Sequence, residues 1–176
     1  PAPRTAPGWG SLFCFSCFHL CLSAVSNVAL RMRNMYVCMQ CAQMVQFGMR
    51  HQIQQMLTQG EGAILNVSSM AGLNGAARGS AYAMAKHAVI GLTKTGAVEY
   101  GRNNIRINAI CPFFTLTPMV TNFADEVQQQ KMSRGAPMHR LGEPKEIVAM
   151  MLMMLSPANT YMTGQCIAID GGVSAQ

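Results

Sequence analysis

Apolar positions are spaced most regularly between residues 62 and 112. The short, mainly apolar run 63–67 is too brief for an independent helix and is flanked by glycine and serine, so it predicts a buried strand. From Ser80 to about residue 100 the apolar positions recur at helical spacing, and Ser80 is the expected N-cap. A second apolar run, 105–110, predicts another buried strand. This strand, helix, strand order is typical of a parallel βαβ unit and predicts an α/β fold.

Three more elements follow from the same kind of pattern. A helix is expected from about Gln40 to Leu57, before the first strand. Pro144 is a residue type favoured in the first turn of a helix, and the apolar positions that follow it as far as Leu155 predict an amphipathic helix. Residues 166–169 are expected to form the last strand.

Composition narrows the class of protein. With 176 residues the chain is long enough for one domain with a hydrophobic core. Half of the residues are hydrophobic and 11% are charged, which excludes a disordered or highly charged binding segment. The formal charge is +6, but no basic stripe interleaved with aromatic residues occurs, so we expect no nucleic-acid surface. The sixteen methionines are expected mainly to fill the core.

The first 39 residues differ from the rest, because they are apolar and rich in cysteine, and we expect the folded domain at 40–176. Residues 1–10 are rich in proline and glycine and predict no fixed structure. The uncharged stretch 11–30 has the length of a membrane span, but polar residues dilute it, and we favour a buried apolar segment over membrane insertion. The seven cysteines, without a convincing secretory context, favour a reducing compartment, so the expected location is cytoplasmic.

Two Cys-x-x-Cys pairs lie near the start of the chain, at Cys14–Cys17 and Cys38–Cys41. Their separation falls inside the window for a zinc ribbon. A tetrahedral thiolate site needs tight polar turns around each pair, and neither pair has a glycine at its turn. We therefore favour coincidence over zinc, and since the four histidines lie in separate elements, we expect no metal site.

Candidate chemistry lies at the carboxyl ends of the two predicted strands, where reactive groups of parallel α/β folds are found. Tyr82 and Lys86 are four residues apart on the predicted helix, so their side chains share one face. An ammonium beside a phenol favours the phenolate and is expected to lower the pKa of the phenol from about 10. Such a tyrosine can exchange a proton with an alcohol or carbonyl oxygen, and the hydroxyl of Ser69 can hold the same oxygen.

A Tyr-x-x-x-Lys pair alone is common on solvated helix faces, but here it stands among further motifs. In chain order these are Asn66-Val67-Ser68-Ser69, Tyr82, Lys86, Asn108-Ala109-Ile110-Cys111-Pro112, residues 137–147, Tyr161-Met162-Thr163-Gly164-Gln165 and Asp170-Gly171-Gly172. Together they resemble the short-chain dehydrogenase/reductase family over roughly residues 40–176. The resemblance implies a Rossmann-like, partial doubly wound parallel sheet whose N-terminal βαβ half is missing or replaced.

The same resemblance implies reversible hydride transfer between NAD or NADP and a small alcohol or carbonyl substrate. It makes Tyr82 the general acid/base, Lys86 the residue that tunes it and holds the nicotinamide ribose, and Ser69 the residue that positions the substrate oxygen. The implied cofactor-binding positions are Tyr82, Lys86, Pro112, Thr115 and Thr117. Proteins of this family pack helices between subunits, so a homo-oligomer is expected.

Several positions depart from the family pattern. Cys41 stands where the family has the asparagine of the catalytic tetrad, and Phe113 where it has a glycine beside the nicotinamide. No glycine-rich turn for the cofactor pyrophosphate occurs before Cys41. Two alternatives therefore stay open beside the enzyme: an inactive truncated chain that associates through its helices, and such a chain anchored to a membrane by residues 11–30.

Overall fold

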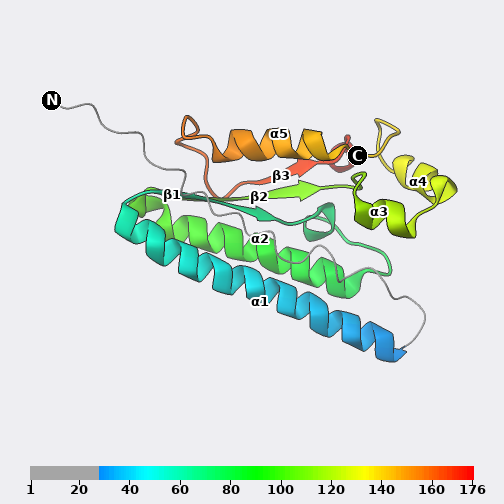
Figure 1. Cartoon of the computed structure of the whole chain (residues 1–176), viewed down its shortest axis with the longest axis horizontal. Helices are drawn as coiled ribbons and strands as arrows, with labels where there is room; N and C mark the ends of the chain where they lie inside the picture. The colour runs from blue at the N-terminus through cyan, green and yellow to red at the C-terminus, as the bar shows by residue number, and fades with distance from the viewer. Residues whose placement is uncertain (1–27) are drawn as a thin grey trace.

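The computed structural model describes residues 28–176, without the side chains of residues 28–34, Met119 and Phe123. Figure 1 shows the arrangement of the helices and strands along the chain. In chain order they are α1 (Val28–Gln59), β1 (Gly62–Val67), η1 (Met70–Gly72), α2 (Ser80–Tyr100), η2 (Gly101–Asn103), β2 (Ile105–Pro112), α3 (Pro118–Phe123), α4 (Glu126–Ser133), α5 (Pro144–Leu155), β3 (Cys166–Ile169) and η3 (Val173–Ala175).

The three strands form one parallel sheet in the order β1-β2-β3. Gly62 pairs with Ile105 at the start of the β1–β2 ladder, and Ala109 pairs with Cys166 at the start of the β2–β3 ladder. Helices α1 and α2 cover one face of the sheet and α5 covers the other (Figure 1). The carboxyl ends of all three strands therefore lie at one edge, together with α3, α4 and η1 (Figure 1).

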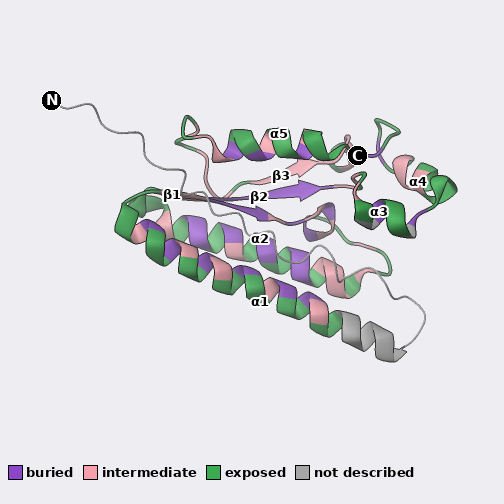
Figure 2. Ribbon diagram, in the orientation of Figure 1, coloured by how far each residue is buried: buried purple, intermediate pink, exposed green. Residues whose placement is uncertain are grey.

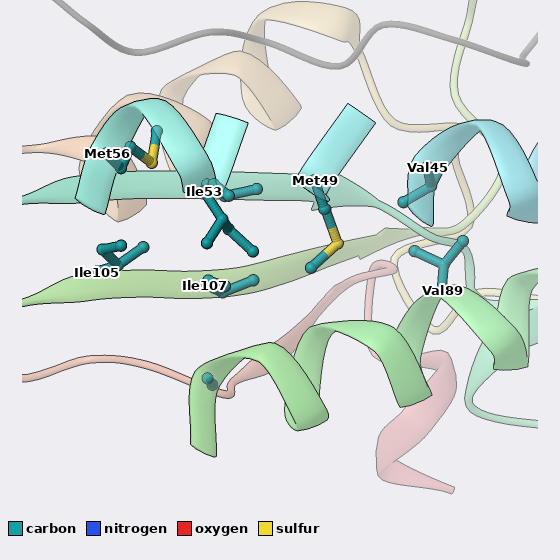
Figure 3. Packing of buried hydrophobic residues seen from close by; sticks show 9 residues of the cluster. Val45, Met49, Ile53, Met56, Val89, Ile105 and Ile107 are labelled. Carbon is teal, nitrogen blue, oxygen red and sulfur yellow. The ribbon is translucent and has the colours of Figure 1, made fainter. Parts of the chain in front are cut away.

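Each face of the sheet has its own apolar core. The residues between the sheet and the α1/α2 layer are Val45, Met49, Ile53, Met56, Ile64, Val89, Ala97, Ile105 and Ile107 (Figure 3). The residues between the sheet and α5 are Leu65, Ile110, Ile147, Met151 and Met154. Ile64 and Leu65 point to opposite faces because side chains alternate along a strand. The central strand β2 is consequently the most deeply buried element (Figure 2).

Most of the expected elements are confirmed. β1, β3 and α5 lie where the pattern placed them, β2 continues to Pro112, and α1 extends well beyond the range expected for it. The expectation for Ser80 is wrong, because Gly79 takes the N-cap position and Ser80 is the first helical residue. The first helical hydrogen bond runs from the amide of Ala83 to the carbonyl of Gly79, at 2.8 Å. The backbone carbonyl of Gly79 thus starts the helix without a side-chain cap.

Three sequence expectations concern membranes, metals and domains. Within the described part of the chain, no helix has the length and apolarity needed to cross a membrane. The same residues contain no group of three or more His, Cys, Asp or Glu side chains arranged to hold a metal ion. Cys14, Cys17 and the stretch 1–27 lie outside the described residues. The division of the chain after residue 39 stays a prediction, and α1 runs through that position.

Candidate active site

The end of β1 is bound to α2 through Ser68. Its side chain is fully buried, and its Oγ donates a hydrogen bond of 2.9 Å to the backbone carbonyl of Lys86. Gly72, in η1, lies against the same carbonyl. A β-carbon at this glycine would approach Ser68 Oγ to 2.5 Å and Lys86 O to 2.8 Å, so no larger residue fits without displacing backbone. The absence of a side chain at Gly72 thus sets how closely the loop after β1 approaches α2.

Ser69 follows at the carboxyl end of β1 in an extended conformation. Its side chain is partly buried, and its Oγ accepts a hydrogen bond of 3.2 Å from the amide of Ala71, which caps η1. This bond uses a lone pair of the hydroxyl oxygen, so the hydroxyl proton can be donated to another oxygen. Ser69 is therefore held in place by the backbone and keeps the ability to donate.

Tyr82 and Lys86 share one face of α2, as their spacing predicted. The ammonium of Lys86 lies 5.7 Å from the centre of the Tyr82 ring, and its Nζ donates a hydrogen bond of 3.0 Å to the carbonyl of Val67. The Lys86 side chain is 9% exposed. Burial of its long stem and the bond to β1 fix where the positive charge lies, beside the phenol and beside the end of the strand.

The carboxyl end of β2 carries two adjacent aromatic residues. The amide of Phe113 donates to the carbonyl of Ile169, and the rings of Phe113 and Phe114 lie 4.7 Å apart and are tilted by 58°. A β-carbon on Gly135 would lie 3.3 Å from the ring of Phe113, so this ring packs against the end of the α4 segment. The larger side chain that replaces the family's glycine is accommodated there.

Thr115 and Thr117 lie in the loop between β2 and α3. Thr115 Oγ1 donates to the carbonyl of Phe113 at 3.1 Å, and Thr115 forms an isolated parallel bridge with Gly142. Thr117 is the N-cap residue of α3, with no hydrogen bond from its side chain to the helix. The two hydroxyls are thus placed at the same edge of the sheet as Ser69 and the carboxyl end of β2.

Cys111 precedes Pro112 on β2 and is fully buried. Burial raises the pKa of the Cys111 thiol to about 11, although the hydroxyl of Ser68, the amide of Ser69 and the charge of Lys86 each favour the thiolate. The thiol therefore stays protonated at neutral pH. It fills space beneath the site as a small buried hydrophobic residue does.

A buried polar network was missed by the sequence analysis. Asn66 is 1% exposed, and its Nδ2 donates to Thr93 Oγ1 at 2.9 Å and contacts Met49 Sδ at 3.3 Å. Thr93 in turn donates to the carbonyl of Val89. Asn66 thereby ties β1 to both covering helices three residues before Ser69. The signal was present in the chain, since Asn66 is the one strongly polar residue in β1.

Cys41, at the position of the family's asparagine, is buried in α1. Its sulfur is part of a disulfide bond and has no hydrogen to donate, so it cannot replace the two-sided hydrogen bonding of a carboxamide. The site thus contains a hydroxyl, a phenol and an ammonium, arranged by β1 and α2. These groups can orient an oxygen atom of a small molecule and exchange a proton with it.

The chain is similar to known proteins. A family model described as enoyl-(acyl carrier protein) reductase matches residues 33–174. Levodione reductase of Leifsonia aquatica is 40% identical over 135 residues, which are 73% of this chain and 51% of that protein. The short-chain dehydrogenase/reductase aba4 of Botryotinia fuckeliana is 43% identical over 116 residues, 63% of this chain and 45% of that protein.

Solved structures agree with the sequence relatives. The crystal structure of levodione reductase superimposes with a TM-score of 0.76 at 35% identity, covering 85% of this chain and 60% of that one. The chain spans about half the length of the curated relatives it matches. The parallel α/β sheet and the family match over most of the described residues show that the chain belongs to the short-chain dehydrogenase/reductase family.

Proposed function

We propose that this chain is the nicotinamide- and substrate-binding part of an oxidoreductase that interconverts an alcohol and a carbonyl compound with NAD or NADP. The observation that carries the proposal is the placement of Lys86 beside both the Tyr82 ring and the end of β1, next to Ser69. Relatives named for this chemistry, levodione reductase and cyclohexanol dehydrogenase, support it. So does a structural relative described as bound to NADPH.

The three side chains have separate roles in the proposed reaction. In the direction of reduction, the carbonyl carbon receives a hydride and the carbonyl oxygen receives a proton from the Tyr82 hydroxyl. Lys86 stabilises the phenolate that remains, because its positive charge is held near the ring. Ser69 donates its hydroxyl hydrogen bond to the same oxygen and so fixes its position relative to Tyr82.

The donor set fits the nicotinamide half of the cofactor. Tyr82, Lys86, Thr115 and Thr117 bring a phenol, an ammonium and two hydroxyls to the carboxyl edge of the sheet, which suits a ribose and a carboxamide, and Pro112 ends the strand there. When bound, the cofactor would supply or accept the hydride. Residues 28–176 contain no glycine-rich turn of the pyrophosphate-binding pattern, so the affinity of this chain for the cofactor is the quantity to measure first.

The proposal is tested by titrating the full chain with NADH and NADPH and by assaying turnover of small ketones. We expect saturable binding in the micromolar range, which corresponds to about 8 kcal/mol. Tyr82→Phe should abolish turnover while leaving cofactor binding within a few-fold, because it removes one hydroxyl. Tyr100→Phe, at the other end of α2, is the matched control. Absence of binding at millimolar cofactor, or full activity of Tyr82→Phe, would refute the proposal.

We also propose that the chain forms a homo-oligomer through the α1/α2 layer. The supporting observation is a set of large apolar side chains exposed on α1, including Tyr36 at 68%, Met39 at 48% and Phe47 at 57%. Apolar patches of this kind favour association. Sedimentation equilibrium of the wild type and of Phe47→Ser tests this: the wild type should be larger than a monomer and the variant shifted toward it. A monomeric wild type would exclude this assembly.

A further inference from the structure

Two segments near the proposed site have no charged side chain, and Arg78 follows directly after the first of them. No Asp, Glu, Lys or Arg occurs in residues 69–77, which follow β1, or in residues 111–124, which end β2 and include α3. Charged residues are typical of exposed loops, so two uncharged segments at one edge of the sheet are informative. They favour a ligand that itself has no charge to be neutralised.

These two segments, and the loop before α5 that contains Met138, expose apolar side chains. Leu73 and Phe114 are each 37% exposed, Leu116 is 40% exposed and Met138 is 60% exposed. Leu73 follows η1, and Phe114 and Leu116 follow β2. These side chains would gain free energy if a small apolar molecule covered them.

Backbone contacts place these residues at the edge that carries Ser69. Gly72 packs on the carbonyl of Lys86, so Leu73 lies beside the first turns of α2. The Gly142 backbone bonds both to the carbonyl of Phe114 and to the amide of Leu116. The amide of Met138 donates to the carbonyl of Gly171, just after β3. The segments after β1 and β2 thus each contribute an apolar residue, and Met138 is bonded to the turn after β3. Figure 1 shows these segments gathered at that end of the sheet.

Charged groups near this edge are already engaged. Arg140 is paired with Glu146 through two hydrogen bonds of 2.6 and 2.8 Å. Burial acts to raise the pKa of Asp170, but hydrogen bonds from the Ser174 side chain and from the amides of Gly172 and Ser174 lower it overall and keep the carboxylate ionised within its own turn. The Lys86 ammonium donates a hydrogen bond to the carbonyl of Val67. Arg78, in the loop before α2, is exposed, so its role in ligand binding can be tested by substitution.

From these observations we infer that the site takes an uncharged, apolar alcohol or ketone, whose hydrocarbon part contacts Leu73, Phe114, Leu116 and Met138 while its oxygen meets Ser69 and Tyr82. This inference rests on the proposed function for the place of the oxygen. A ring or short alkyl group suits the Phe114 side chain, because aromatic and aliphatic surfaces pack without a polar partner. A substrate with a carboxylate or phosphate would lose hydration without gaining a counter-charge from these loops.

The experiment compares two probes that share a ring, cyclohexanone and 4-oxocyclohexanecarboxylate, by saturation-transfer NMR titration of the full chain without cofactor. We expect the uncharged ketone to bind at least tenfold more tightly. Phe114→Ser should weaken its binding on the order of tenfold through loss of buried apolar area. Leu152→Ser, an exposed apolar position on α5, is the control and should bind as the wild type does. Leu116→Ser provides the same readout if Phe114→Ser folds poorly.

Equal or tighter binding of the carboxylate probe, especially if Arg78→Gln abolishes it, would overturn the inference. So would wild-type affinity for cyclohexanone in both Phe114→Ser and Leu116→Ser. Because the titration needs no cofactor, its result is independent of the NADH and NADPH titrations. Ketone binding that depends on Phe114 without cofactor binding would retain the inference and refute the proposed reaction. Cofactor binding without ketone binding would refute the inference and retain the proposed reaction.

Discussion

Gly72→Ala is the substitution whose effect the structure predicts most directly. The added β-carbon would lie 2.5 Å from Ser68 Oγ, 2.8 Å from Lys86 O and 2.9 Å from Lys86 C. Two of these three atoms belong to the backbone of α2, so rotation of a flexible side chain cannot relieve the overlap. The loop after β1 must move away from α2, and with it the segment that carries Ser69.

The expected cost has two parts. Forcing a methyl group into a packed region typically costs about 1–3 kcal/mol. Displacing Ser68 also breaks its 2.9 Å bond to the Lys86 carbonyl, which contributes about 1 kcal/mol. We therefore expect Gly72→Ala to lower the free energy of unfolding by about 2–4 kcal/mol, a large part of the 5–15 kcal/mol typical of a domain.

Urea unfolding followed by circular dichroism measures this change. With a slope of about 1–3 kcal/mol per molar urea, the midpoint should fall by roughly 0.7–4 M. Gly75→Ala is the matched control, because it lies three residues away in the same loop and its β-carbon would have no atom within 4 Å. This control should be neutral or stabilising by less than about 1 kcal/mol.

A double-mutant cycle separates the two parts of the cost. In a Ser68→Ala background the hydroxyl is already absent, so Gly72→Ala should cost less than it does in the wild type, by about 0.5–2 kcal/mol. The reasoning fails if the free energy of unfolding of Gly72→Ala lies within about 0.5 kcal/mol of the wild-type value, or if Gly72→Ala and Gly75→Ala are equally stable. Strict additivity with Ser68→Ala would show that the serine is not part of the strained contact.

Three further predictions follow from the same contacts. Thr93→Val removes the acceptor of the hydrogen bond from Asn66 Nδ2 within a buried network. It should lower the free energy of unfolding, measured with urea, by about 1–3 kcal/mol. In the folded chain Cys111 should resist iodoacetamide at pH 8, because its thiol is buried and its pKa is raised to about 11. It should react once the chain is unfolded, and peptide mass spectrometry measures the labelling in both states. The hydrogen bonds from Arg140 lower the pKa of Glu146 to about 2. This carboxylate therefore stabilises the fold at pH values above its unfolded-state pKa of about 4, and the stabilisation is lost as the pH falls toward 2. Glu146→Gln should therefore be less stable than the wild type at pH 7 and equal to it at pH 2 in urea unfolding.

Each of these has an outcome that contradicts it. An unchanged midpoint for Thr93→Val would mean that the Asn66 amide finds another partner. Rapid labelling of Cys111 in the folded chain would show that β2 opens readily. A stability difference for Glu146→Gln that persists unchanged at pH 2 would mean that the carboxylate acts through packing and not through its charge, because a protonated glutamate and a glutamine carry the same charge.

Residues close together in the sequence determined much of the fold and part of the site. The apolar runs at β1, β2 and β3 and the pattern of α5 are local properties of the chain, so their positions could be predicted. Tyr82 and Lys86 share a helix face because any two residues four apart do so. The N-cap of α2 was mispredicted although it is local, because glycine is itself a favoured N-cap residue and Gly79 directly precedes Ser80.

Contacts between distant residues were decided only by the tertiary structure. The bond from Ser68 to the Lys86 carbonyl joins residues eighteen apart, and the bond from Asn66 to Thr93 joins residues twenty-seven apart. Periodicity reports which face of an element is apolar, but not how closely two elements approach. That distance depends on the side chains between them, and here it depends on Gly72, which has no side chain. By itself the sequence therefore determined which groups do the proposed chemistry, and packing of α2 against β1 decided where they stand.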